Sequence, residues 1–401
     1  MNPLKKIYCR CFQLAFRLAI PLMPYRKPRI FSSINECVEE LARLGVSSLL
    51  LVTDSFLRKS GVTATLESLL GERRIDCHVY DGTQPNPTVQ NVEEATALYR
   101  KGGCQSLVAF GGGSSMDCAK ATGACVVYPK RSLAQMRGLL RVLRRLPPLV
   151  AIPTTAGTGS ETTVTAVITD PVEKHKYTMN NFTMIPRYAV LDPAVTYSLP
   201  PQLTATTGMD ALAHAVEAYI GGSTTRETRQ MALEATKLIF SNIKAAYDDG
   251  SNHAARKAML QAAYKAGVAF TQSYVGYIHA VAHTLGGQYG IPHGLANSVL
   301  MPVVLEKYGS AVYKKLHQMA GAAGLCLDSD TDEVAAKKFI QAIRDLNKHM
   351  NIPECFDAIR EEDIPHMVAY AEKEANPLYP VPVLMDKGEL EYFYRAVMTR
   401  P

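Results

Sequence analysis

A short apolar run that leads directly into three glycines constrains the fold of this 401-residue chain most strongly. Ser106 to Phe110 has the pattern of a buried strand, Gly111 to Gly113 follow it, and Met116 to Val127 has the pattern of a helix. Glycines let a backbone approach a phosphate group, and amide groups at the start of a helix point toward its negative charge. The segment therefore predicts a phosphate-binding loop, although tight turns also use glycines.

Other runs extend this unit into an alternation of strands and helices. Strands are expected at Ser48 to Thr53, Ile75 to Tyr80 and Leu149 to Pro153. A helical pattern follows the first of these strands and ends at Leu70, and another covers Val89 to Arg100. Such an alternation is typical of a parallel sheet with helices on both faces. Ligands of these sheets bind at the carboxyl ends of the strands. We therefore predict a Rossmann-like α/β domain in the first half of the chain.

Polar residues follow two of the expected strands at that edge. Thr154 to Ser160 place hydroxyl groups after the fourth strand, and Asp54 follows the first. A carboxylate there could bind ribose hydroxyls and repel a ribose phosphate, which favours NAD over NADP. The usual dinucleotide fingerprint has its acidic residue about 20 residues after the glycines, whereas Asp54 precedes them. Asp54 could alternatively serve only as the cap of the helix that follows it.

The second half of the chain, from about residue 200, is expected to be helical. Asp210 and His214 are four residues apart, as are His279 and His283, so each pair shares one helix face; His293 follows a turn that contains glycine. One carboxylate and several imidazoles suit a divalent ion such as iron or zinc. Spacing alone does not say which histidine is not a ligand. A lone buried histidine is more often a hydrogen-bonded core residue.

Positive charge is concentrated at the amino terminus. The chain has 43 basic and 37 acidic residues, for a net charge of +6. The first 30 residues contain no acidic residue but seven basic ones, namely Lys5, Lys6, Arg10, Arg17, Arg26, Lys27 and Arg29. The remainder is therefore close to neutral, which disfavours a nucleic-acid-binding protein. We expect no nucleic-acid partner.

The same amino-terminal segment has apolar residues at helical spacing, at Leu4, Tyr8, Cys11, Ala15 and Leu18. It is too short and too charged to span a bilayer, which takes about 20 mostly apolar residues, and it lacks a signal-peptide cleavage site. A helix on an anionic membrane surface and a helix packed on its own body or on a sister subunit are both open. The nine scattered cysteines indicate reduced thiols, so we expect a cytoplasmic protein, peripheral to a membrane if the segment binds one.

Five segments, taken in order, resemble motifs of the iron-containing (type III) alcohol dehydrogenase family. They are PNPT (Pro85 to Thr88), GGGSSMDCAK (Gly111 to Lys120), PTTAGTGSE (Pro153 to Glu161), GMDALAHAVEAY and HAVAHTLGGQYGIPHG. The arm over residues 1–27 lies outside the resemblance, which begins at about residue 28. The resemblance implies a dehydroquinate synthase-like architecture, with a dinucleotide-binding domain over residues 28–199 and a helical metal- and substrate-binding domain over 200–401. It also implies NAD and one divalent metal in the cleft between the domains, with Fe(II) favoured over Zn(II).

The resemblance assigns roles residue by residue. It makes Asp210, His214, His279 and His293 the metal ligands, and leaves His283 as a non-ligand that faces the nicotinamide and relays a proton. Its cofactor-contacting positions are matched by Asp54, Gly112, Gly113, Ser114, Asp117, Thr154, Thr155, Thr158, Lys176 and Leu191. It gives no account of the arm or of the basic segment from Lys130 to Arg145.

The residues and the resemblance together predict hydride transfer between a small alcohol and NAD, or the reverse reduction of an aldehyde, in a homodimer or larger assembly. A polyol dehydrogenase of glycerol or diol type and a sugar-phosphate cyclase share this plan. A scaffold or assembly subunit with a structural metal is the alternative outside enzymes. Phe270, Tyr274, Tyr277 and Tyr289 hint at an apolar substrate pocket, although aromatic residues in a helix bundle are more often core.

Overall fold

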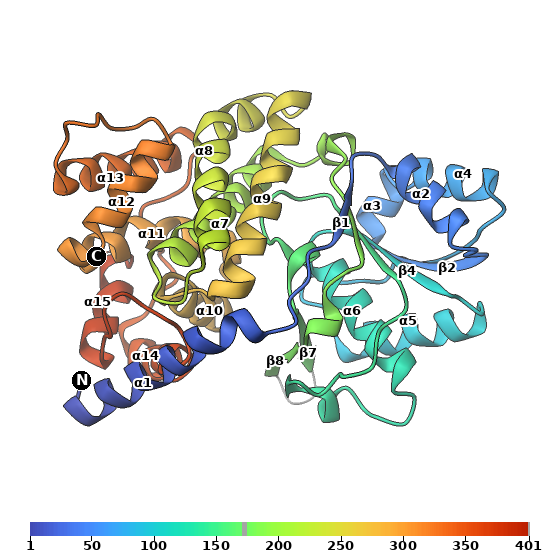
Figure 1. Cartoon of the computed structure of the whole chain (residues 1–401), viewed down its shortest axis with the longest axis horizontal. Coiled ribbons are helices and arrows are strands. Elements are labelled where there is room, and N and C mark those ends of the chain that lie inside the picture. Colours follow the sequence, from blue (N-terminus) through green and yellow to red (C-terminus); the bar gives the residue numbers. More distant parts are fainter. Residues whose placement is uncertain (171–174, 400–401) are drawn as a thin grey trace. The chain divides into compact units, whose positions relative to one another are not determined.

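The structure is a computed structural model that describes residues 1–170 and 175–399, and it contains two compact units (Figure 1). Pro24–Ser198 forms an α/β unit. Met1–Met23 joins the chain from Leu199 onward in a helical unit. Residues 1–23 of the arm thus belong to the helical unit, although they lie far in sequence from the rest of that unit. Pro24 to Lys27 belong to the α/β unit.

A parallel sheet forms the centre of the α/β unit. Its described strands follow the order β1-β9-β6-β4-β2-β3, and every neighbouring pair is parallel. The four strands expected from the sequence are confirmed as β2, β3, β4 and β6. The sequence did not predict β1 and β9, because three residues carry no periodic signal. The bounds are β1 (Arg29–Phe31), β2 (Ser48–Val52), β3 (Asp76–Tyr80), β4 (Ser106–Gly111), β6 (Leu149–Pro153) and β9 (Tyr188–Val190).

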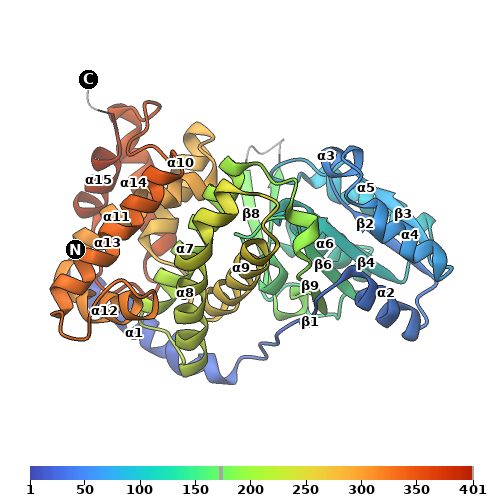
Figure 2. The same ribbon diagram turned by 90° about the horizontal axis from the view of Figure 1, so that it is seen from above.

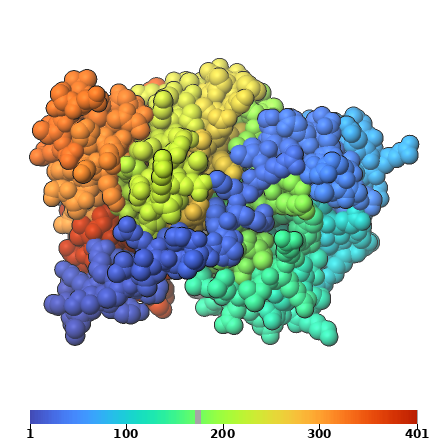
Figure 3. Space-filling view, in the orientation of Figure 1, coloured from blue at the N-terminus to red at the C-terminus, as the bar shows by residue number. Residues whose placement is uncertain are grey.

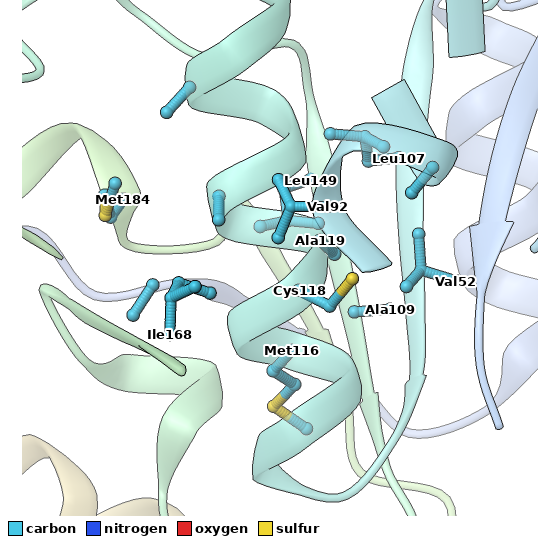
Figure 4. Close-up of a cluster of buried hydrophobic side chains, with 14 of the residues drawn as sticks. Val52, Val92, Leu107, Ala109, Met116, Cys118, Ala119, Leu149, Ile168 and Met184 are labelled. Carbon is cyan, nitrogen blue, oxygen red and sulfur yellow. The ribbon is translucent and has the colours of Figure 1, made fainter. Parts of the chain in front are cut away.

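Helices cover both faces of this sheet, as expected. Leu50 and Val52 of β2 belong to a buried cluster with residues of α5 and α6, part of which is shown in Figure 4. Leu49 and Leu51 belong to the opposite cluster, with residues of α2 and α4. Successive side chains of β2 therefore enter different cores, which explains why its sequence is a continuous apolar run. The helices are α2 (Ile34–Arg43), α3 (Ser55–Lys59), α4 (Ala64–Glu72), α5 (Val89–Lys101) and α6 (Gly113–Val127).

A small second sheet in the same unit was not predicted. Its described strands are β5 (Gly138–Leu139), β8 (His175–Asn180) and β7 (Thr165–Asp170), in that order. The basic segment from Lys130 to Arg145 leads into and out of β5. The guanidinium groups of Arg131 and Arg144 lie 4.5 and 5.1 Å from the centre of the Tyr128 ring. These cation–π contacts fold the segment back on the end of α6.

The helical unit is built around α7, most of which is buried. Helices α8, α9 and α11 pack against it, and Figure 2 shows this bundle from above. The expectation of an all-helical second domain is confirmed. The bounds are α7 (Pro201–Ile220), α8 (Arg226–Asp248), α9 (His253–Ser273), α10 (Tyr277–Tyr289), α11 (His293–Tyr308), α12 (Tyr313–Ala322), α13 (Asp332–His349), α14 (Ile364–Ala375), α15 (Lys387–Ala396), and α1 (Pro3–Ala19) from the arm.

The arm forms the helix that its spacing predicts. Asn2 caps α1 by accepting a hydrogen bond from the backbone N–H of Leu4, and Pro21 lies in the short turn that follows the helix. Across the described ranges, no helix combines the length and the apolar character needed to cross a bilayer.

Candidate metal centre and cofactor loop

Four side chains from three helices converge within the helical unit. Asp210 and His214 lie one turn apart on α7, His279 lies on α10, and His293 is the first residue of α11. One oxygen or nitrogen atom of each lies within 4.8 Å of those of the others. The Nε2 atoms of His279 and His293 lie 3.8 and 3.4 Å from Oδ1 of Asp210. The structure thus brings together the four residues that the resemblance names as ligands.

The chemistry of this cluster fits one divalent ion. Asp210, His214 and His279 are buried and His293 is half-buried. Nε2 of His279 is buried with no hydrogen-bond partner among the described residues, an arrangement that is costly unless a ligand is bound. Burial lowers the pKa of His293 to about 4 and lowers that of His279 as well. Both imidazoles are therefore neutral at physiological pH, which is the form that binds metals.

Glu217 orients His279 from the side away from the cluster. It lies on α7, and its Oε2 is 2.6 Å from Nδ1 of His279, while its Oε1 accepts a hydrogen bond from the backbone N–H of Ile278 at 2.8 Å. Burial raises the pKa of Glu217 to about 8, against backbone N–H groups that lower it. A cation on Nε2 would favour the proton on Nδ1 and hence an ionised Glu217. Glu217 was not predicted from the sequence, although it is three positions after His214 on the same helix face.

Asn297 links two of the four side chains. It lies one turn after His293 on α11, and its Nδ2 donates a hydrogen bond to Oδ1 of Asp210 at 2.7 Å. The same nitrogen lies 3.2 Å from Nε2 of His293. The close approach of α11 to α7 requires glycine at position 294, because a Cβ there would lie 2.3 Å from the carbonyl oxygen of Thr206. Asn297 was not predicted from the sequence either.

His283 lies beside the cluster but is not part of it. Its Nδ1 is 2.6 Å from Oε1 of Glu374 on α14, and the hydroxyl of Tyr379 donates to the same oxygen at 2.7 Å. The His283 ring stacks on that of His293 with 5.1 Å between ring centres. Removal from water lowers the pKa of His283, but the charge and hydrogen bond of Glu374 raise it, and the net shift is upward. His283 is therefore held in place and made more basic.

The aromatic residues that hinted at a pocket differ in their surroundings. Phe270 stacks on His214 at 4.0 Å between ring centres, so it borders the cluster. Tyr277 is fully buried, and its hydroxyl donates to Oδ1 of Asn376 at 3.0 Å, as expected of a core residue. Tyr274 meets the arm at Phe16, and the hydroxyl of Tyr289 donates to Asp363.

In the α/β unit, the glycine loop and the threonine loop lie side by side. Gly111 ends β4 and pairs with Pro153 at the end of β6. A Cβ added to Gly112 would lie 3.6 Å from the Thr155 side chain, and one added to Gly113 would lie 3.3 Å from that of Thr158. Thr154, next to them, donates its backbone N–H to the carbonyl of Gly111 at 3.1 Å. The carboxyl ends of these two strands therefore place amide groups and hydroxyl groups at one edge.

Asp54 caps α3, which was the alternative considered for it. Its Oδ1 accepts a hydrogen bond from the backbone N–H of Leu57 at 2.9 Å. In the glycine loop, the Ser114 hydroxyl accepts a hydrogen bond from the backbone N–H of Asn86 at 3.2 Å. Leu191 is buried just after β9. The backbone of Lys176 belongs to β8, but its side chain lies outside the part that the structure describes.

Asp117 belongs to a polar network under the two loops. Its Oδ1 accepts a hydrogen bond from the Ser160 hydroxyl at 3.0 Å, and its Oδ2 accepts one from the backbone N–H of Val167 at 3.1 Å. The fully buried Lys120 donates to the carbonyl of Ser160 at 2.7 Å. Burial lowers the pKa of Lys120 to about 8, while the charge of Asp117 opposes this shift. The motif that contains Lys120 did not predict this buried role.

Comparison with known proteins places both halves of the chain in one group. Residues 30–193 match the family model described as iron-containing alcohol dehydrogenase, and residues 204–398 match that of the Fe-containing alcohol dehydrogenase family, C-terminal. The arm precedes both matches.

Among curated relatives, the 1,3-propanediol dehydrogenase of Klebsiella pneumoniae is 37% identical over 365 residues, which cover 90% of this chain and 93% of that protein. The NAD-dependent methanol dehydrogenase of Bacillus methanolicus is 36% identical over 83% of this chain and 87% of its own. Among solved structures, a 1,3-propanediol oxidoreductase is 36% identical and superposes with a TM-score of 0.89 over 93% of this chain and 99% of its own.

Proposed function

Because this chain belongs to the iron-containing alcohol dehydrogenase family, we propose that it is a metal-dependent, NAD-linked alcohol dehydrogenase that also reduces aldehydes. The observation that carries the proposal is the convergence of Asp210, His214, His279 and His293 within the helical unit. The buried, unpartnered Nε2 of His279 supports a bound cation in particular.

The four converging side chains would hold the ion, and iron is favoured over zinc by the family to which the chain belongs. Bound there, a divalent ion supplies a Lewis acid for the oxygen of the alcohol or aldehyde. Glu217 keeps the lone pair of His279 Nε2 directed at the cluster, and Asn297 holds Oδ1 of Asp210. These two residues act as positioning residues, since neither belongs to the ligand set.

His283 would relay the hydroxyl proton of the substrate. With Nδ1 hydrogen-bonded to Glu374, its Nε2 is the nitrogen left to accept a proton. The carboxylate of Glu374 stabilises the imidazolium that results, which makes His283 a stronger base than an isolated histidine. The hydroxyl of Tyr379 donates to Glu374 and holds it in turn, so the two residues fix the orientation of the His283 ring.

The loops at the carboxyl ends of β4 and β6 would hold the dinucleotide. Bound NAD supplies the acceptor for the hydride. Gly112, Gly113 and Ser114 offer backbone amides at the start of α6 to the pyrophosphate. We assign further cofactor contacts to Asp117, Thr154, Thr155, Thr158, Lys176 and Leu191. Only one oxygen of Asp54 is used for capping, so the other can bind ribose hydroxyls and oppose a 2′-phosphate.

Small alcohols are the proposed substrates. Relatives named for methanol and for 1,3-propanediol favour primary alcohols and keep a diol dehydrogenase as the second candidate. Phe270 beside His214 would give the site an apolar wall suited to a short carbon chain. A homodimer or larger assembly stays a prediction, which sedimentation would test.

A substrate panel tests the function. Anaerobically purified protein should raise the absorbance near 340 nm when NAD and a primary alcohol are added, and should do so less well with NADP. Metal analysis of the same sample should find iron. A metal-replete protein that is inactive toward every alcohol, diol and aldehyde would instead support the scaffold alternative.

A further inference from the structure

Helix α1 contacts the helical unit through a largely polar face. Cys9 and Gln13 are buried at this contact, and Nε2 of Gln13 donates to the carbonyl of Tyr379 at 2.7 Å. The guanidinium group of Arg10 donates to the carbonyls of residues 381 and 382 at 2.8 Å each. These contacts confirm that the arm packs on its own body, which was one of the alternatives, and they fix which side of α1 faces inward.

Further contacts hold α1 along its whole length. The amino-terminal ammonium group pairs with Asp386, and Lys5 pairs with Glu372 at 2.6 Å. Toward the other end, the Phe16 ring meets Tyr274 edge-on at 4.9 Å between ring centres. Contacts near the start, middle and end leave α1 no freedom to rotate about its axis without losing several of them.

The opposite face of α1 is apolar and points away from the body. Leu4, Ile7, Leu14 and Leu18 are between 56% and 75% exposed. Their spacings of three, seven and four residues put them in one stripe along the helix. Figure 3 shows the arm in dark blue at the surface of the helical unit. A helix that only covers its own body turns its apolar stripe inward, so this orientation indicates a partner for the stripe.

Positive charge accompanies the stripe. Lys6 and Arg17 are exposed on α1, and no carboxylate in the described ranges pairs with either. The arm contributes no acidic residue of its own. Next to the stripe, an open groove of about 470 Å³ is lined by Lys6, Ile7, Arg10, Cys11 and the segment Pro382 to Leu384. Its walls are mainly apolar and its charged groups are cationic.

We propose that α1 is a membrane-surface helix whose apolar stripe enters the headgroup region of an anionic bilayer while Lys6 and Arg17 contact lipid phosphates. Charge favours this occupant over a second copy of the chain. Two arms that paired through their stripes would bring two acid-free basic segments together. The stripe also covers about two heptads, fewer than the three or four that identify a coiled coil. An anionic lipid surface, by contrast, both neutralises the positive charge of the arm and covers its apolar side chains.

Tryptophan fluorescence gives a direct test, because the chain contains no tryptophan. Full-length Leu14→Trp would carry a single fluorophore in the stripe, and Leu327→Trp would carry one at another exposed leucine of the helical unit. With vesicles of phosphatidylglycerol and phosphatidylcholine, Leu14→Trp should shift its emission to the blue and Leu327→Trp should not. Vesicles of phosphatidylcholine alone should produce a much smaller shift, as should high salt.

Matched variants separate the two contributions in a vesicle-sedimentation assay. Lys6→Gln with Arg17→Gln should weaken binding about 25-fold, since each basic residue near an anionic surface contributes about fivefold. Leu14→Ser with Leu18→Ser should weaken it at least about tenfold. Leu327→Ser is the control and should bind as the wild type. A circular dichroism spectrum and a melting temperature equal to those of the wild type would show that each variant is folded.

Three results would overturn the inference. They are equal binding to anionic and zwitterionic vesicles, binding that the Leu14→Ser and Leu18→Ser changes leave intact, and a fluorescence shift that depends on protein concentration without lipid. The last result would identify a second copy of the chain as the occupant of the stripe. None of these outcomes depends on the proposed dehydrogenase activity.

Discussion

Helices α7 and α1 of the helical unit both break the rule that polar side chains face water and apolar ones face the core, but in opposite ways. Helix α7 is mostly buried yet carries Asp210, His214 and Glu217 toward the interior. Helix α1 lies at the surface yet directs leucines to the outside. A buried polar group and an exposed apolar stripe both raise the free energy of a protein unless something compensates. We propose that a ligand completes each helix: a cation for α7 and a lipid surface for α1.

Removal of one ligand should have the largest effect. His279→Ala takes away a buried imidazole of the cluster, and we expect it to lose bound metal and about three orders of magnitude in kcat/KM. His366→Ala, which removes an exposed histidine of α14, should change neither. Metal analysis together with steady-state rates measures both variants. Full metal content in His279→Ala would contradict the assignment of His279 as a ligand and would leave its buried, unpartnered Nε2 unexplained.

The positioning role of Glu217 should give the next largest effect. Glu217→Gln keeps the shape of the side chain but weakens its hold on Nδ1 of His279, so metal affinity should fall about 10- to 100-fold. Competition with a chelator measures this affinity. Glu227→Gln on α8 is the control, since it changes the same residue type at an exposed position. Equal affinities in the two variants would show that Glu217 contributes only to packing.

Close packing beside the cluster predicts an effect on stability. Gly294→Ala forces a Cβ against the carbonyl of Thr206 and should lower the free energy of unfolding by about 1–3 kcal/mol. Gly287→Ala on α10 meets nothing within 4 Å and should raise it by about 0.4–1 kcal/mol. Denaturant unfolding of both variants checks the sign of each change. An unchanged or raised free energy of unfolding in Gly294→Ala would mean that α11 does not pack against α7 as described.

The outward face of α1 predicts the smallest effect. Leu18→Ser should change the free energy of unfolding by less than about 0.5 kcal/mol, because the side chain is exposed. Ile20→Ala, at a buried position just after α1, should cost about 2 kcal/mol or more. Thermal melting compares them. A large loss of stability in Leu18→Ser would mean that the stripe packs against the body, which would remove the contrast with α7.

The sequence predicted the sheet, the helix face shared by candidate ligands and the amphipathic arm, but not the residues that surround each of them. The apolar runs of β2, β4 and β6 identified the sheet because those strands are covered on both faces. The one-turn spacing of Asp210 and His214 identified a shared helix face. Glu374 escaped notice because it lies 91 residues from His283 and only tertiary packing brings them together. For the same reason the spacing in α1 predicted an amphipathic helix, while the direction of its apolar stripe required the contacts with residues 377–386.

The claim that a divalent ion completes α7 is tested most directly by titrating metal-free protein with Fe(II) under anaerobic conditions while alcohol-dependent NADH formation is followed. We expect the rate to be near zero without metal and to rise until about one equivalent of iron per chain is bound. The His279→Ala variant should show no such rise. Full activity of the metal-free protein, or an equal rise in His279→Ala, would contradict the claim.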